Sequence, residues 1–389
     1  MGVRGTVATR LGWFLACVCS VVALPAGAES RIVAYAGSSL PAVIHPEKLT
    51  HINFAFAHIQ AGRAVLDQAG STADIAGLRS LKKTNPRLKV LVSVGGWTAD
   101  GFSDAALTDT SRRTFARSVV EILRQNDLDG VDLDWEYPGQ GAAGIKYRPE
   151  DKGNFTLLLK TVRSELDAAG TATKHAGVDH YLLTIAAADR EYFDHVEMSR
   201  LHVYVDWINE MAYDFFNSLT PTTGHHAGLY LSKFAAPTDR TADAAVKQYL
   251  AAGVPAGKIV LGVPFYGRAF AGVTAKNNGI DQPYEHFQDF YSYTDLVEKF
   301  IGKQGYVRYW DTDARAPYLW NAASRSFISY EDPQSLAVKV CYVQAQHLGG
   351  VMFWELKLDR NDALLDVIAR GCVSHPSFDA AADNSVSTR

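Results

Sequence analysis

Short apolar runs alternate with amphipathic stretches along most of this chain. The apolar runs are rich in branched aliphatic and aromatic residues, which is typical of buried parallel strands, and the stretches between them have helical periodicity. Strands are predicted at Arg31–Ala36, His51–His58, Leu88–Val94, Gly130–Trp135, Tyr181–Ala187, Trp207–Ala212, Ile259–Phe265 and Gly350–Trp354. Helices are predicted at Ala73–Lys83, Asp109–Gln125, Lys152–Ala169, Ala242–Ala252 and Pro333–His347. This alternation predicts an α/β fold, a closed (β/α)₈ barrel. An open doubly wound sheet is the alternative, but no Gly-x-Gly-x-x-Gly motif follows the first strand.

The interval between the seventh and eighth predicted strands, Arg268 to Gly349, is too long for a single helix. Its first part is rich in Gly, Asn, Asp and aromatic residues. Because a structureless loop of that length is uncommon in a compact domain, we predict a small α+β insertion at 269–330. The barrel would then be formed by residues 29–268 and 331–374.

The two ends of the chain differ from the rest. Arg4 and Arg10 precede an apolar run, Leu11–Pro25, which is followed by the small residues of Ala26-Gly27-Ala28. This pattern predicts a secretory signal peptide at 1–28, and a myristoylation or lipoprotein signal fits it less well. The polar segment 375–389 is predicted to be a disordered tail.

Composition narrows the class of ligand. The chain is 47% hydrophobic with a net charge of −4, and it has no basic stripe for nucleic acid. No later segment is apolar enough for a membrane helix. Its 7 Trp and 18 Tyr suit sugar rings, which stack on aromatic faces. Beyond residue 28 only Cys341 and Cys372 remain, and a disulfide or two buried thiols are equally compatible with the sequence. No metal site and no cofactor are expected.

The most informative motif is Asp129-Gly-Val-Asp-Leu-Asp-Trp-Glu136. Because side chains alternate along a strand, Asp132, Asp134 and Glu136 share one face, and Asp129 falls outside that row. Three acids on one face of a buried strand repel one another and are costly to desolvate, so the row indicates proton-sharing chemistry. A calcium loop or a solvated acidic strand is the alternative, but the apolar filling between the acids disfavours both.

This acidic motif resembles the signature of the family 18 glycoside hydrolases, the chitinases. Four further segments resemble other motifs of that family and occur in the family's order, so that the resemblance covers about residues 31 to 370. They are Ser93-Val-Gly-Gly-Trp97, Met211-Ala-Tyr-Asp214, Gly262-Val-Pro-Phe-Tyr-Gly-Arg268 and Gly350-Val-Met-Phe-Trp-Glu355.

The resemblance implies a role for each acid. Glu136 would be the general acid and later the base, and Asp134 would orient the substrate's acetamido group. Asp132 would share a proton with Asp134, and Tyr213 would donate its hydroxyl to the acetamido oxygen. Family 18 is a known exception to the two-carboxylate scheme of glycosidases, because the substrate's own acetamido carbonyl attacks the anomeric carbon.

The same resemblance implies two further groups of residues, one that supports the acids and one that binds the substrate. Ser93 and Tyr35 would hydrogen-bond Asp132. The residues expected to line the substrate are Trp97, Tyr137, Met211, Asp214, Tyr266, Arg268, Trp354 and Glu355. The first strand departs from many relatives by having Ala36 and Gly37 where those carry bulk, so exo or endo action stays open.

The sequence therefore predicts a secreted, monomeric chitinase, extracellular or periplasmic, that acts on chitin or chito-oligosaccharides. It would be free of the membrane after signal cleavage. A chitinase-like lectin is one alternative, although such proteins lose the glutamate that is present here as Glu136. An endo-β-N-acetylglucosaminidase that acts on N-linked glycans is another, and the predicted insertion and its aromatic residues count against it.

Overall fold

The computed structural model describes residues 1–2, 30–66, 69–171 and 177–373. The predicted signal peptide, apart from its first two residues, and the predicted tail at 375–389 lie outside the described residues.

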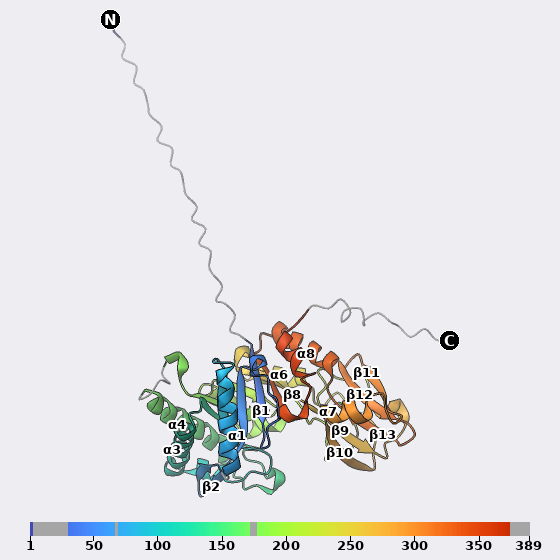
Figure 1. Cartoon of the computed structure of the whole chain (residues 1–389), viewed down its shortest axis with the longest axis horizontal. Helices are drawn as coiled ribbons and strands as arrows, with labels where there is room; N and C mark the ends of the chain where they lie inside the picture. Colours follow the sequence, from blue (N-terminus) through green and yellow to red (C-terminus); the bar gives the residue numbers. More distant parts are fainter. Residues whose placement is uncertain (3–29, 67–68, 172–176, 374–389) are drawn as a thin grey trace.

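Eight parallel strands close into a barrel (Figure 1), whose strands run from β1 in blue to β14 in red. The barrel strands are β1 (Arg31–Ala36), β2 (His51–Gln60), β4 (Lys89–Gly95), β5 (Gly130–Asp134), β6 (Leu182–Ala187), β7 (Trp207–Glu210), β8 (Ile259–Pro264) and β14 (Gly350–Trp354). Because β1 pairs with both β2 and β14, the sheet has no open edge, and the predicted (β/α)₈ fold is confirmed. A short strand, β3 (Arg63–Val65), extends β2 as a hairpin.

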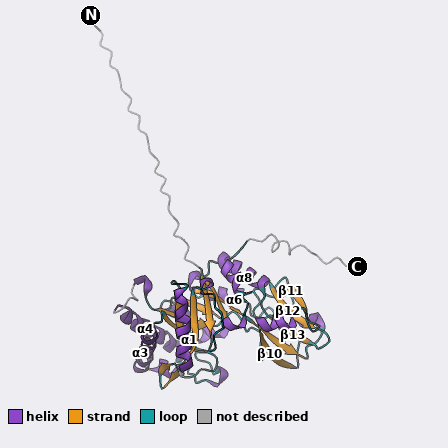
Figure 2. Cartoon of the chain, viewed as in Figure 1, coloured by secondary structure: helices purple, strands orange, loops and turns teal. Residues whose placement is uncertain are grey.

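Helices surround the barrel strands (Figure 2). The three-residue helix α7 (Tyr293–Asp295) belongs instead to the interval between β8 and β14. The helices around the barrel are α1 (Ala69–Ser80), α2 (Phe102–Leu107), α3 (Asp109–Asn126), α4 (Asp151–Thr171), α5 (Met198–Leu201), α6 (Ala242–Ala251), α8 (Pro333–Ala345) and α9 (Leu365–Arg370). Their starts follow local chemistry, since Thr108 caps α3 and Asp332 caps α8, each in a reciprocal capping box.

The strands are buried on both faces, as parallel strands covered by helices are. The outward face of the acidic segment shows how this fixes the site. Trp135 is 1% exposed, stacks on Phe102 of α2 at 5.2 Å between ring centroids, and meets Phe155 of α4 edge-on at 5.4 Å. This aromatic packing anchors the backbone that carries Asp134 and Glu136 on its other face.

A second sheet lies between β8 and β14 in the sequence and beside the barrel in space, in orange in Figure 1. Its antiparallel strands, in spatial order, are β10 (His286–Ser292), β9 (Tyr266–Ala271), β13 (Ser326–Ser329), β12 (Ala316–Asn321) and β11 (Val307–Asp311). Because β9 begins at Tyr266, both Tyr266 and Arg268 belong to this sheet.

Three barrel strands end earlier than the apolar pattern predicts. β5 stops at Asp134 rather than Trp135, β7 stops at Glu210 rather than Ala212, and β8 stops at Pro264 rather than Phe265. At each of these places the chain leaves the hydrogen-bonded ladder at the C-terminal end of a barrel strand.

Cys341 of α8 and Cys372, just after α9, form a disulfide, which settles the question that the sequence leaves open. Within the described part of the chain, no helix is both long enough and apolar enough to cross a membrane.

Candidate active site

The register of the barrel places Asp132 level with Ser93 of β4 and Thr184 of β6. Its Oδ2 accepts hydrogen bonds from the Tyr35 hydroxyl at 2.8 Å and the Ser93 hydroxyl at 2.7 Å. Its Oδ1 accepts from the Thr184 hydroxyl at 2.6 Å and from Asn209 Nδ2 at 3.1 Å. The two donors on Oδ2 are the residues that the sequence assigns to its support.

Four donors occupy the acceptor positions that one carboxylate offers. Burial raises the pKa of Asp132, and all four hydrogen bonds oppose that rise. The pKa of Asp134 is raised further, well above its ordinary value, by burial and in part by the charge of Asp132. That the two acids share one proton stays a prediction.

Asp134 is 4% exposed, and its buried Oδ1 has no hydrogen-bond partner. Burial raises its pKa well above the ordinary value, and the charges of Glu136 and Asp132 raise it further. Close backbone approach fixes its position. Gly95 has φ +120°, and a Cβ there would lie 2.0 Å from the Asp134 carbonyl oxygen, which also accepts a hydrogen bond from Gly96 N–H at 2.9 Å.

Glu136 follows β5 by two residues and is partly exposed. Burial raises its pKa to about 7, with the charge of Asp214 adding to the rise and a hydrogen bond from Tyr137 opposing it. A carboxylic acid with such a pKa holds its proton near neutrality and can still release it, which is what a general acid–base group needs.

Asp214 faces this acid from the end of β7. Its Oδ1 accepts hydrogen bonds from the Tyr266 hydroxyl at 2.7 Å and from Arg268 Nε at 2.5 Å. Burial alone would raise its pKa, but His226 and Arg268 hold it well below the usual range. Asp214 therefore stays charged, and β9 of the second sheet supplies two of its partners.

The floor of the site is aromatic. Trp354, at the end of β14, stacks on Phe56 with a centroid distance of 5.7 Å and leans against Tyr35 at 5.7 Å. Met211 and Trp354 pack on the same buried cluster, which contains Tyr213. Tyr213 is 9% exposed, and burial together with the nearby acids raises its pKa well above the ordinary value, so its hydroxyl remains a donor.

Two further predicted residues flank the acids. Trp97 is 53% exposed and meets the Tyr137 ring edge-on at 6.3 Å. Large aromatic rings held open to solvent in this way suit stacking on a sugar.

Glu355 is 5% exposed, and its carboxylate accepts a hydrogen bond from Gly37 N–H at 2.8 Å and pairs with Lys357 at 3.2 Å. A Cβ on Gly37 would lie 2.7 Å from Glu355 Oε2. The glycine that departs from many relatives thus permits a contact between the first and last barrel strands.

Sequence reasoning missed several members of the site. Thr184 is a polar residue within the otherwise apolar strand β6, which the sequence does show, but that Thr184 and Asn209 reach Asp132 depends on the register between strands. Phe290 of β10 is 56% exposed and meets the Tyr266 ring at 6.0 Å, but exposed aromatics in an insertion carry no sequence signal. No sequence signal pointed to His226 either, which is buried beside Asp214.

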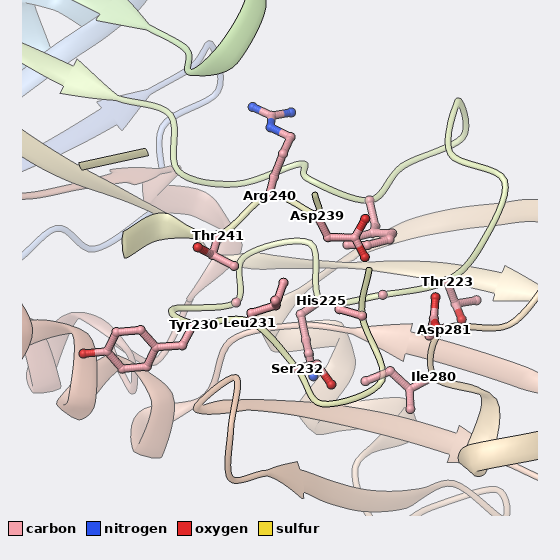
Figure 3. Close-up of a pocket in the computed structure, with 14 residues that line it drawn as sticks. Thr223, His225, Tyr230, Leu231, Ser232, Asp239, Arg240, Thr241, Ile280 and Asp281 are labelled. Atoms are coloured by element: carbon pink, nitrogen blue, oxygen red, sulfur yellow. The ribbon is translucent and has the colours of Figure 1, made fainter. Parts of the chain in front are cut away.

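A separate small pocket lies in the long segment between β7 and α6 (Figure 3). In that view His225 and Ser232 lie together, and both hydrogen-bond to Asp311 of β11, at 3.1 and 2.6 Å. None of the predicted site residues lines this pocket, and its polar groups tie the segment to the second sheet. Among the described residues, no group of three or more His, Cys, Asp or Glu side chains is placed to hold a metal ion.

The family model of the glycosyl hydrolases family 18 matches residues 31–359. Among curated proteins, chitinase A1 of Niallia circulans is 40% identical over 85% of this chain, and chitinase B of Serratia marcescens is 32% identical over 83%. The matches span 56% and 76% of those two proteins.

Among solved structures, a family 18 N-acetylglucosaminidase from Paenibacillus barengoltzii is similar with a TM-score of 0.83 and 42% identity. The match covers 88% of this chain and 99% of that one. The barrel, the acidic row and these matches agree, and the chain belongs to family 18 of the glycosyl hydrolases.

Proposed function

We propose that this protein is a chitinase that hydrolyses β-1,4-linked N-acetylglucosamine with retention of the anomeric configuration, assisted by the substrate's acetamido group. The observation that carries the proposal is Glu136. It ends a row of three acids in a family 18 chain, and its pKa of about 7 suits a group that first donates and then accepts a proton.

In the first step, Glu136 donates its proton to the glycosidic oxygen, and the bond between that oxygen and the anomeric carbon breaks. The substrate's acetamido carbonyl oxygen attacks the anomeric carbon and forms an oxazolinium ion. Asp134 accepts the acetamido N–H, and Tyr213 donates its hydroxyl to the acetamido oxygen. The unpartnered Oδ1 of Asp134 supports this role, because a buried acceptor without a partner is free to take a substrate donor.

In the second step, the Glu136 carboxylate removes a proton from water, and the water oxygen bonds to the anomeric carbon as the oxazolinium opens. Two inversions at one carbon retain its configuration. The charge of Asp132 stabilises the positive charge that develops in both steps, and its four donors keep it fixed.

The sugar at the cleaved bond would lie on Trp354, with Met211 beside it. Trp97, Tyr137 and Phe290 would stack on neighbouring sugars, and Asp214, Tyr266, Arg268 and Glu355 would line the polar side of the cleft. Chito-oligosaccharides fit this mixture of aromatic faces and hydrogen-bonding groups.

We also propose that residues 1–28 direct export and that the protein acts outside the cytoplasm as a monomer. The Cys341–Cys372 disulfide supports an oxidising compartment. In the same proposal, residues 29–268 and 331–374 form the barrel unit, 269–330 the insertion, and 375–389 a tail.

Removal of single N-acetylglucosamine units from a chain end is a second candidate. One observation favours it, the similarity to a family 18 N-acetylglucosaminidase. Endo action and exo action would share the chemistry described above and differ only in which sugars the cleft accepts.

Replacing the general acid should separate binding from turnover. Glu136→Gln should lower kcat on chitin hexasaccharide by about 10³-fold or more, because the amide cannot donate the proton, and should leave binding nearly intact. Glu150→Gln, which changes an exposed glutamate outside the site, is the matched control. Near-normal turnover in Glu136→Gln would exclude the assignment, and a wild type that binds without cleaving would favour the lectin.

The length of the first products separates the two modes of action. A cleft that binds the middle of a chain should release disaccharides and longer fragments from the hexasaccharide at early times. Exo action should release only monosaccharide together with the pentasaccharide. Mass spectrometry of products at less than about a tenth of full conversion distinguishes them, because later products are themselves cut.

Thermal unfolding should report the raised pKa of Glu136 without any substrate. A carboxyl whose folded pKa is raised contributes stability below its unfolded pKa, and that contribution is lost as pH rises through about 7. Glu136→Gln, which never ionises, should therefore gain in Tm relative to wild type as pH rises from about 4.5 to about 7 and should hold that gain above pH 7, with little difference near pH 4. Calorimetry at several pH values from about 4 to about 8 measures this, and a difference that does not change over that range would contradict the raised pKa.

A further inference from the structure

Asp214 is held from one side. The Tyr266 hydroxyl and Arg268 Nε both donate to its Oδ1, and His226 Nδ1 lies 3.5 Å from the same oxygen. The side chain is still 32% exposed. Because its contacts gather on Oδ1, Oδ2 is the oxygen available to a substrate or to Glu136.

His226 is fixed more firmly than a loop residue usually is. It is fully buried, with its ring tilted against Tyr266 at 5.4 Å between centroids. Its backbone N–H donates to Ser329 Oγ of β13 at 2.8 Å, and its carbonyl accepts from Phe215 N–H at 3.0 Å. The backbone of His226 is therefore held between Phe215, the residue that follows Asp214, and the second sheet, while its ring packs on Tyr266.

The surroundings of His226 keep its ring neutral. Burial lowers its pKa, the positive charges of Arg268 and Lys339 lower it further, and only Asp214 opposes them. Lys339 of α8 is itself paired with Glu331 at 2.6 Å, and Tyr266 on β9 is a neutral phenol whose pKa is raised well above the ordinary value by burial. These are the titratable and charged groups that face the ring from the elements packed around it.

A neutral imidazole carries one N–H, which can sit on either nitrogen. A proton on Nε2 would turn the lone pair of Nδ1 toward the Asp214 carboxylate, which is repulsive. A proton on Nδ1 makes the same approach attractive. Among the described residues neither nitrogen has a partner at ordinary hydrogen-bond geometry, and Asp214 Oδ1, 3.5 Å from Nδ1, is the acceptor that the ring approaches, so this carboxylate selects the tautomer.

We propose that His226 is a positioning residue of the reaction, a neutral Nδ1–H donor that holds Asp214 Oδ1 and leaves Oδ2 directed to the substrate. The inference rests on the proposed function of the site. A second cation in this place would offset the negative charge that Asp214 presents to Glu136, whereas a neutral donor orients the carboxylate and preserves its charge.

Two substitutions separate donation from packing. In His226→Asn the amide nitrogen can take the place of Nδ1, whereas His226→Phe keeps a ring but removes the donor. We expect His226→Asn to keep kcat on chito-oligosaccharides within about 3-fold of wild type and His226→Phe to lose about 10-fold or more, with an altered pH profile. If the ring only fills space, the order reverses, because Phe packs and Asn leaves a cavity; that result would overturn the proposal.

The neighbouring histidine provides the control. His225, labelled in Figure 3, is also buried, but its ring is hydrogen-bonded to Asp311 and not to Asp214. His225→Phe should lower Tm and leave the pH profile of the remaining activity unchanged. A shift in that profile as large as the shift in His226→Phe would mean that both act through general loosening of the segment, which would refute a specific role.

The tautomer of the His226 ring can be determined without measuring enzyme activity. In the wild-type protein with ¹⁵N-labelled histidine, NMR should show a protonated Nδ1 and an unprotonated Nε2 for His226, assigned by its loss in His226→Asn. The opposite tautomer, or a charged ring at pH 7, would overturn the inference. Because this spectrum needs no substrate, it remains decisive even if the wild type fails to cleave chito-oligosaccharides and the proposed function falls.

Discussion

The site depends on one buried carboxylate, that of Asp132, and on the four hydrogen bonds that it accepts. A carboxylate inside a barrel is costly to desolvate unless its acceptors are filled, and here β1, β4, β6 and β7 each contribute one donor. These hydrogen bonds oppose the rise that burial causes in the pKa of Asp132, whereas Oδ1 of Asp134 has no such donor among the described residues. Burial raises the pKa of Asp134 and of Glu136, and the charge of Asp132 adds to the rise at Asp134.

The barrel sheet and the second sheet control different properties of these acids. The barrel sets the depth of each acid through strand register, and the aromatic packing of Trp135 holds the segment from behind. The second sheet sets the charge on the opposite side, because β9 delivers Tyr266 and Arg268 to Asp214 and β13 holds His226. Asp214 in turn raises the pKa of Glu136, so the insertion influences the proton of the general acid.

Much of the fold and of the candidate site could be predicted from the sequence, for identifiable reasons. The barrel was predictable because buried parallel strands are nearly continuous apolar runs, and the acidic row because side chains alternate along a strand. The donors Thr184 and Asn209 depend on the register between strands, which a single sequence does not encode locally. The contact between Gly37 and Glu355 joins residues more than three hundred positions apart. His226 and Phe290 lie in irregular or inserted segments without periodicity, so only the folded structure shows what they approach.

In the proposed mechanism the substrate's own acetamido group is the nucleophile, and the acids only guide and protonate it. The most direct test is proton NMR of the anomeric signals while the wild-type protein first cleaves chitin hexasaccharide, before the products mutarotate. This mechanism predicts that the new reducing ends appear as the β anomer and relax later toward equilibrium. Initial release of the α anomer would show direct attack by water and would contradict the roles given to Asp132, Asp134 and Glu136.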